Sequence, residues 1–310
     1  MADTHRLIVA IGDLFLDLLG HVPGLPRRGT AVWGAAPIRC PGGTTGNVAA
    51  GLARLGEQVL FVGAVGDDDV GKFLVEDLAA SGVDVSGVAW KPGISQGLSI
   101  ALIEPDGERT FLGLALKAAP SHLAPADLTL IDRLSPPPSM IFLTGPQMRE
   151  EPARSTQVGF VRRWQGRAPL YFDTNLQQCG ASPERVVVEA LREVAARSDV
   201  VMTSEDDMQA LGLKPGPGQL YAVKRGAQGA RLVTVDGIVA EVAGHQVAVL
   251  DALGAGDVFD AGFMAARARR LADADALCLA NAAAALSVEK PGGRSAPEWA
   301  EAAALAGLTT

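Results

Sequence analysis

The stretch Asp251-Ala-Leu-Gly-Ala-Gly-Asp257, followed by Val-Phe-Asp-Ala-Gly-Phe-Met-Ala-Ala, decides how the rest of the chain is interpreted. Gly254, Ala255 and Gly256 precede Asp257, and the acid opens an alanine-rich segment that predicts a helix. Small residues allow a backbone to approach a ligand closely, and a first helical turn offers unpaired N–H groups at the positive end of its dipole. We therefore expect an anion hole here. Because a carboxylate repels phosphate, Asp257 in this position indicates a base beside a phosphoryl group.

The two acids of this stretch also have simpler explanations. A helix N-cap would account for Asp257, and a turn at the end of a strand would account for Asp251. The Gly-Ala-Gly sequence between them favours a functional role, because a plain cap needs no such loop.

Length and composition predict one large α/β domain. The chain has 310 residues, 48% of them hydrophobic and 20% charged, which is ample material for a large core. Short apolar runs alternate with segments of helical periodicity, so we expect a three-layer α/β/α fold with a mostly parallel central sheet. The expected strands are residues 7–11, 59–65, 141–144, 170–172, 200–202, 221–224 and 231–235, and the expected helices are 42–55, 70–80, 184–196, 261–270 and 274–288.

Two regions interrupt this alternation. Residues 18–39 are rich in Pro and Gly, and residues 97–116 predict a hairpin that turns at Glu104-Pro-Asp-Gly107. Strands without intervening helices indicate a small sheet of their own. We therefore expect a β-rich lid inserted in a single domain that spans residues 1–310.

Charge and cysteine content exclude several classes of partner. A net charge of −8 argues against general binding to nucleic acid or to an anionic membrane. The three cysteines are far apart and lack metal or disulfide spacing, which favours reduced thiols in a cytoplasm. No signal peptide and no apolar run of about 18 residues is evident. We expect a cytoplasmic protein that binds small molecules.

Three further motifs contain candidate binding residues. Gly42-Gly43-Thr-Thr-Gly-Asn47 stands before a predicted helix, where Asn47 either offers a donor and an acceptor to hydroxyl groups or merely caps a tight loop. Asp17 follows the first strand, where it either accepts sugar hydroxyls or is solvated. Lys224-Arg-Gly226-Ala-Gln-Gly229 fits a nucleotide-binding turn as well as a plain hairpin.

Taken in order, these motifs resemble the ribokinase-like (PfkB) family of carbohydrate kinases over nearly the whole chain. The amino-terminal signature of that family is similar to residues 42–56, and its next block is similar to Val62-Gly-Ala-Val-Gly-Asp67-Asp-Asp-Val-Gly71. The carboxy-terminal signature resembles Asp251-Ala-Leu-Gly-Ala-Gly-Asp257-Val-Phe259, and the nucleotide-binding strand and turn resemble residues 223–229.

The resemblance implies ATP-dependent transfer of the γ-phosphoryl group to a primary hydroxyl, with Asp257 as the base and the amides of residues 253–257 as the anion hole. It implies that Mg²⁺ arrives with the nucleotide and that the lid closes over the sugar, and in several relatives the lid also forms a homodimer. The residues it assigns are Gly254, Ala255 and Gly256 to the anion hole, Asp17, Gly42, Gly43 and Asn47 to the acceptor, Ser204, Lys224, Gly226, Gly229 and Asn281 to the nucleotide, Asp207 to Mg²⁺, and Asp251, Ser287 and Gly292 to a monovalent cation such as K⁺.

The chain departs from the family pattern at several positions. Ser204-Glu-Asp-Asp207 stands in place of Asn-x-x-Glu, and Asp251-Ala-Leu loses the two hydroxyls of Asp-Thr-Thr. Asp173-Thr-Asn175 is followed by Leu-Gln-Gln instead of an Arg, and Thr44 stands where sugar-phosphate and ribose members often have Lys. Without these two cations a doubly charged acceptor would lack two partners. We therefore expect a neutral, fructose- or ribose-like sugar.

Two alternatives remain open. A nucleoside kinase of the same family is the runner-up, with Phe15, Trp33 and Phe111 available either to stack on a base or to fill the core. A non-catalytic sensor of sugars or nucleotides would explain the altered residues 204–207, although binding alone would not require Asp257. A Rossmann-type oxidoreductase is disfavoured because the first strand is not followed by Gly-x-Gly-x-x-Gly.

Overall fold

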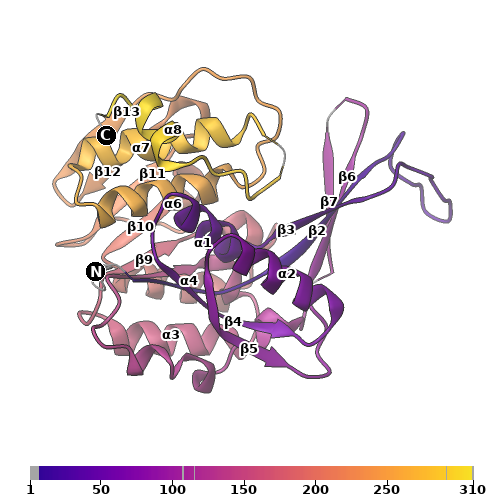
Figure 1. Cartoon of the computed structure of the whole chain (residues 1–310), viewed down its shortest axis with the longest axis horizontal. Helices are drawn as coiled ribbons and strands as arrows, with labels where there is room; N and C mark the ends of the chain where they lie inside the picture. Colours follow the sequence, from indigo (N-terminus) through magenta and orange to yellow (C-terminus); the bar gives the residue numbers. More distant parts are fainter. Residues whose placement is uncertain (1–6, 107, 115, 291, 309–310) are drawn as a thin grey trace.

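The alternation of strands and helices builds a central sheet of nine strands with helices on both faces (Figure 1). The computed structural model describes residues 7–106, 108–114, 116–290 and 292–308. The strand order is β13-β12-β11-β10-β9-β8-β1-β4-β5, in which β11 to β5 run parallel and β12 and β13 form an antiparallel edge. The strands are β1 (Ile8–Ile11), β4 (Val59–Gly66), β5 (Asp84–Lys91), β8 (Met140–Thr144), β9 (Leu170–Asp173), β10 (Val200–Ser204), β11 (Leu220–Lys224), β12 (Ala230–Thr234) and β13 (Gly237–Val242).

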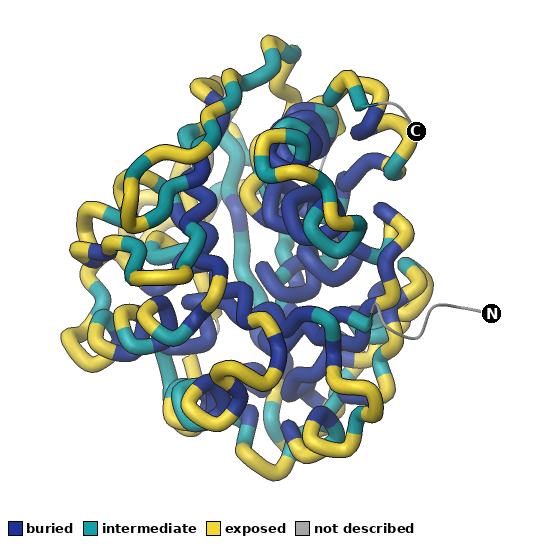
Figure 2. Tube along the Cα trace, turned by 90° about the vertical axis from the view of Figure 1, so that its left-hand side faces the viewer, coloured by how far each residue is buried: buried dark blue, intermediate teal, exposed yellow. Residues whose placement is uncertain are grey.

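Alternate side chains of each strand point to opposite faces of the sheet, which produces two cores. In β1, Ile8 and Ala10 pack into one core, and Val9 and Ile11 pack into the other. The first core is covered by α1 (Thr44–Arg54), α2 (Asp69–Ala80), α6 (Ala255–Ala268), α7 (Asp273–Ser287) and α8 (Trp299–Leu305), and the second by α3 (Ala153–Trp164) and α4 (Arg185–Arg197). Figure 2 shows the buried trace running through the centre of the molecule. The expected three-layer α/β/α fold is confirmed.

A second sheet of four strands, called here the lid sheet, projects from one side of the molecule (Figure 1). Its order is β3-β2-β6-β7, with β2 (Phe15–His21), β3 (Ile38–Gly42), β6 (Leu98–Ile103) and β7 (Arg109–Leu114). The strands β6 and β7 form the expected hairpin, whereas β2 and β6 run parallel, so the sheet is mixed. The first lid segment was predicted as residues 18–39, but β2 begins earlier, at Phe15, and β3 ends later, at Gly42. Residues 107 and 115 of the second predicted segment, 97–116, lie outside the described residues.

Helix α6 begins at Ala255, so Asp257 lies in its first turn as expected. The helix predicted from apolar periodicity, residues 261–270, starts later than α6. The reason is that the small residues at the start of α6 give no periodic apolar signal. Shorter helical segments are α5 (Glu205–Ala210) and the 3-10 turns Ala119–His122, Pro125–Leu128, Ile131–Arg133, Gly145–Met148, Leu176–Cys179 and Gly226–Gln228. Among the residues described, no helix has the length and apolar character needed to cross a membrane.

Candidate active site

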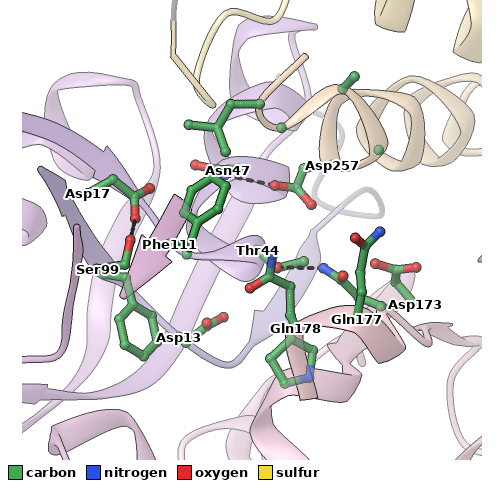
Figure 3. A pocket seen from close by; sticks show the side chains of 18 of the residues that line it. Asp13, Asp17, Thr44, Asn47, Ser99, Phe111, Asp173, Gln177, Gln178 and Asp257 are labelled. Carbon is green, nitrogen blue, oxygen red and sulfur yellow. Dashed lines mark hydrogen bonds between the residues drawn. The ribbon is translucent and has the colours of Figure 1, made fainter. Parts of the chain in front are cut away.

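An open pocket of about 840 Å³ lies where the carboxyl ends of the parallel strands meet the lid sheet (Figure 3). This edge is where ligands bind in open α/β sheets. The central sheet contributes residues at or just beyond the ends of β1, β9, β10 and β11, and α6 contributes its amino-terminal turn. The lid sheet closes another side with Asp17, Ser99 and Phe111.

Asp257 is the third residue of α6 and lines this pocket. The helix begins after Gly254, whose φ is 75°, and no side chain caps it, so Asp257 is not an N-cap. A Cβ atom on Gly254 would lie 2.5 Å from the carbonyl oxygen of Gly293, which leaves room for glycine alone. Gly254, Ala255 and Gly256 therefore bring the first turn to the pocket wall, where the N–H of Ala255 donates to the carbonyl oxygen of Ala252 at 3.3 Å and the amides that follow have no acceptor within the helix. This is the geometry expected of an anion hole.

Burial raises the pKa of the Asp257 carboxyl group towards neutral pH. Its side chain is 8% exposed. Desolvation raises the pKa of Asp257 to about 7, while the hydrogen bond from Asn47 acts in the opposite direction. A general base is most effective when its pKa lies near the working pH.

Asn47 connects the glycine-rich loop to this carboxylate. Its Nδ2 atom donates to Oδ2 of Asp257 at 2.7 Å (Figure 3). Helix α1 begins after Gly43, whose φ is 91°, so Asn47 lies in the first turn and is not the cap. Oδ1 of Asn47 is buried, and among the described residues it has no hydrogen-bond partner. A buried acceptor of this kind is available to a hydroxyl group of a ligand.

Two further carboxylates lie at the junction of the two sheets (Figure 3). Asp13 follows β1 and is 2% exposed, and its Oδ1 accepts from the backbone N–H of Thr45 at 3.2 Å. Asp17 lies on β2 and accepts a hydrogen bond from the hydroxyl of Ser99 on β6. Burial raises the pKa of both carboxyl groups. The site thus offers hydroxyl acceptors from the central sheet and from the lid sheet.

Lys224, at the end of β11, lines the pocket but is engaged by two carboxylates. Its Nζ atom lies 2.8 Å from Oδ1 of Asp173 and 3.1 Å from Oδ1 of Asp260. Burial by itself would lower the pKa of Lys224, but the two carboxylates raise it instead. The lysine is therefore charged, and Asp260 is a partner that sequence reasoning missed.

The residues predicted for the nucleotide are only partly gathered in the pocket. Ser204, Lys224 and Gly226 line it. Asn281 does not, and its Nδ2 atom donates to the carbonyl oxygens of Val242 and Ala243 at 3.4 and 3.5 Å. Gly229 packs against the same segment, since a Cβ there would lie 2.1 Å from the Val242 oxygen. Their assignment to the nucleotide stays a prediction.

Asp207, the residue predicted to assist Mg²⁺, is 8% exposed and lines the pocket. Its Oδ2 atom accepts from Oγ1 of Thr174 at 2.8 Å and from the N–H of Leu176 at 2.9 Å. Within the described part of the chain, no three His, Cys, Asp or Glu side chains gather into a metal site. One carboxylate fits a Mg²⁺ ion that is held chiefly by phosphates and water.

The residues predicted for a monovalent cation lie close together. Asp251 accepts hydrogen bonds from the N–H of Leu253 at 2.8 Å and of Gly292 at 3.0 Å. The N–H of Asp251 donates to the carbonyl oxygen of Val288 at 3.0 Å, next to Ser287 at the end of α7. Residue 291 of this segment lies outside the described residues.

Several pocket residues were not predicted as binding residues. They include Asp13, Ser99, Arg149, Asp173, Asn175, Gln177 and Gln178, whereas Phe111, considered above as a stacking residue, does line the pocket. Arg149, Asn175 and the two glutamines follow the ends of β8 and β9. Their position after the carboxyl ends of parallel strands is the sequence feature from which a binding role could have been predicted. Arg149 is a pocket cation that differs from the two missing family cations, and its charge opposes the effect of burial on the pKa of Asp13. Trp33, in contrast, is 89% exposed and belongs neither to the core nor to the pocket lining.

Comparison with known proteins agrees with this geometry. Residues 5–300 match the pfkB family carbohydrate kinase pattern. The chain is 29% identical to "Probable fructokinase-7" of Arabidopsis thaliana, over 94% of this chain and 89% of that protein. It is 28% identical to aminoimidazole riboside kinase of Salmonella typhimurium, over 92% of this chain and 90% of that protein.

A solved structure extends the likeness to three dimensions. An uncharacterized sugar kinase of Pyrococcus horikoshii in complex with ATP superposes with a TM-score of 0.82 at 25% identity, covering 96% of this chain and 99% of that one. The family match therefore spans both glycine motifs, the lid sheet and Asp257. The chain belongs to the pfkB family of carbohydrate kinases, which are phosphotransferases with an alcohol group as acceptor.

Proposed function

We propose that the protein transfers the γ-phosphoryl group of ATP to a primary hydroxyl of a neutral, fructose- or ribose-like sugar. The observation that carries the proposal is the buried Asp257 carboxylate beside the open first turn of α6. Asp257 takes the proton of the attacking hydroxyl, and the amides at the start of α6 stabilise the negative charge that develops during transfer. Within residues 253–257, the N–H groups of Leu253 and Ala255 already donate to Asp251 and Ala252, so this role falls to those of Gly254, Gly256 and Asp257. The ATP complex of the Pyrococcus horikoshii relative supports the choice of donor.

The charges of the pocket support a neutral acceptor. Asp13, Asp17, Asp173, Asp207 and Asp257 outnumber Arg149 and Lys224 among its lining residues. Carboxylates accept hydrogen bonds from sugar hydroxyls and repel phosphate or carboxylate groups on an acceptor. Within this proposal Asp17 and Asn47 bind the sugar. Gly42 leaves space for Asp17, since a Cβ there would lie 2.2 Å from Oδ2 of that residue.

The opposite end of the pocket suits the nucleotide. Ser204 and Gly226 line the pocket, and Gly229 and Asn281 lie outside its lining beside Val242 at the end of β13. Asp207 would hold Mg²⁺ that is bound chiefly by phosphates and water, and the loop of Asp251, Ser287 and Gly292 would hold a monovalent cation such as K⁺. These ions neutralise phosphate charge, while the side chains of the protein orient the acceptor.

A nucleoside acceptor is the second candidate. Phe15 and Phe111 line the sugar end of the pocket, where an aromatic ring can stack on a base. The likeness to aminoimidazole riboside kinase favours the same candidate. The sensor alternative has no comparable support, because the relatives are named kinases and Asp257 is retained.

The outer face of the lid sheet supports a homodimer. Phe111 and Gly113 of β7 face the pocket, so Leu112 and Leu114 point to the other side, where each is 54% exposed. We infer that a second copy of the chain covers this aliphatic face. Analytical ultracentrifugation of wild type and of Leu112→Lys/Leu114→Lys tests it: the variant is expected to be a monomer, and a wild-type monomer would refute the homodimer.

One assay tests the catalytic proposal. ADP release is measured for wild type, Asp257→Ala and Asp257→Asn with neutral sugars, nucleosides, sugar phosphates and sugar acids. Neutral sugars are expected to stimulate wild type, and loss of the base is expected to reduce the rate roughly 10²–10⁴-fold. Turnover with phosphorylated or acidic sugars alone would refute the neutral acceptor, and full activity of Asp257→Ala would refute the assigned base.

A further inference from the structure

Three carboxylates and one ammonium group meet beneath the first turn of α6. Asp257 and Asp260 lie three residues apart and therefore on the same side of that helix. Lys224 reaches Asp260 from β11, and Asp173 reaches the lysine from β9. A Cβ atom built on Gly256 would lie 3.7 Å from Nζ of Lys224, so the ammonium group lies against the helical turn that forms the anion hole.

The position of the ammonium group is fixed from two sides. Nζ lies 2.8 Å from Asp173 on the sheet and 3.1 Å from both carboxylate oxygens of Asp260 on the helix. The side chains of Asp173 and Asp260 are 2% and 0% exposed. Buried charges persist only when they are paired and hydrogen-bonded. Lys224 is therefore clamped, and it cannot turn away without leaving two buried carboxylates unpaired.

We propose that Lys224 is a positioning residue for catalysis: clamped by Asp173 and Asp260, its ammonium group is held against the first turn of α6, where it favours the ionised form of Asp257 that accepts the hydroxyl proton. This inference rests on the proposed role of Asp257 as the base. It also gives Asp260, a residue buried behind the pocket, a role in the acid–base chemistry of the site.

The other groups that act on Asp257 make the contribution of Lys224 necessary. Burial, Asp173 and Asp13 raise the pKa of Asp257, whereas the Asn47 amide and Lys224 lower it. Arg149 acts on Asp13 in turn. Burial and Asp173 also raise the pKa of Asp260, so Asp257 and Asp260 compete for a proton. Among the described residues, Lys224 is the cation whose charge acts on both of them.

The test is the pH profile of kcat/KM for full-length variants with saturating Mg²⁺ and ATP and a neutral sugar. Lys224→Met removes the positive charge and is expected to move the acidic limb to higher pH by about one unit or more. Asp260→Asn removes the competing carboxylate and is expected to move the limb to lower pH. The double variant, which removes one charge of each sign, is expected to return towards wild type.

Controls separate this role from folding and from nucleotide contact. Lys224→Arg retains the charge and is expected to keep the limb in place. Thermal unfolding is recorded for every variant, and Asp260→Asn, nearly isosteric with the native residue, provides the test if Lys224→Met does not fold. The inference would be overturned if a folded Lys224→Met or Asp260→Asn variant had the same acidic limb of kcat/KM as wild type. It would also be overturned if the sole effect of these substitutions were a higher KM for ATP.

Failure of the proposed function would give a different set of results from failure of the inference about Lys224. If Asp257→Asn retains the wild-type profile, the base has been misassigned whatever Lys224 does. If Asp257→Asn is inactive while Lys224→Met and Asp260→Asn shift the limb in the same direction, the base is right and the inference about Lys224 is wrong. If Asp257→Asn is inactive and the acidic limb shifts in opposite directions in Lys224→Met and Asp260→Asn, both the assigned base and the role of Lys224 are supported.

Discussion

Nδ2 of Asn47 lies 2.7 Å from Oδ2 of Asp257, although the two residues are 210 positions apart in the chain. The contact joins the first turn of α1 to the first turn of α6, so the glycine-rich loop and the anion hole meet at one carboxylate oxygen. The hydrogen bond stabilises the charged form of Asp257 and fixes the direction of its other oxygen. In the proposed mechanism Asn47 therefore acts on the base as well as on the acceptor.

Asn47→Ala is expected to lower kcat by roughly 10–100-fold, because it removes a charge-assisted hydrogen bond from the base and an acceptor from the sugar site. It is also expected to move the acidic limb of kcat/KM to higher pH, because that hydrogen bond lowers the pKa of Asp257. Steady-state kinetics between pH 5 and pH 9 measure both effects. A higher KM for sugar with an unchanged limb would show that Asn47 serves the acceptor alone.

The wild-type profile should itself report Asp257. Its pKa of about 7 predicts that kcat/KM rises as pH increases through about 7 and then levels off, because the base must be ionised. The same carboxyl group affects stability. Its pKa is higher in the folded than in the unfolded chain, so its contribution to stability is greatest below pH 4 and is lost as pH rises through 7.

Asp257→Asn should therefore have a higher Tm than wild type at pH 8, with the difference shrinking as pH falls towards 4. Differential scanning calorimetry across this range measures it. A variant less stable than wild type at pH 8 would contradict the desolvation of this carboxylate.

Gly254→Ala should damage both stability and catalysis. Its φ of 75° costs an L-residue about 1–2 kcal/mol, and the added Cβ would lie 2.5 Å from the Gly293 carbonyl oxygen. The matched control is Gly166→Ala, at an exposed turn with φ 77° and no atom within 4 Å of the added Cβ. Denaturant unfolding should show the larger loss for Gly254→Ala, and only that variant should lose activity. Equal activity in the two would mean that the shape of the anion hole does not require glycine.

Phe111→Ala should weaken acceptor binding. Phe111 lines the pocket from β7, and removal of its ring is expected to raise KM for the acceptor by about tenfold, with little effect on KM for ATP. Leu112→Ala is the control, because this neighbour has nearly the same exposure, 54% against 55%, but points to the other face of the strand. Parallel changes in both variants would indicate a general disturbance of the lid sheet instead of a contact with the acceptor.

Local patterns were enough to predict the central fold and the two signatures of the site. The apolar run before Gly12 and the glycines around Asn47 indicate a strand and a ligand loop, and β1 and α1 occupy those positions. The identity of Asp260 as a partner of Lys224 could not be predicted, because the contact joins a strand and a helix whose spacing is set by packing. Arg149 was missed for a similar reason: a single Arg beyond a strand end gives no motif.

The lid sheet has its strands outside both hydrophobic cores: among the described residues, neither core includes a side chain of β2, β3, β6 or β7. The lid strands bury Leu16, Leu19 and Ala101, but Asp17, Ser99 and Phe111 lie outside the two cores of the central sheet. Substitutions there can change which acceptor is recognised while the phosphoryl-transfer end stays intact. If these side chains bind the acceptor as proposed, we expect the scaffold to be modular in evolution, with new acceptor specificities arising at small cost in folding.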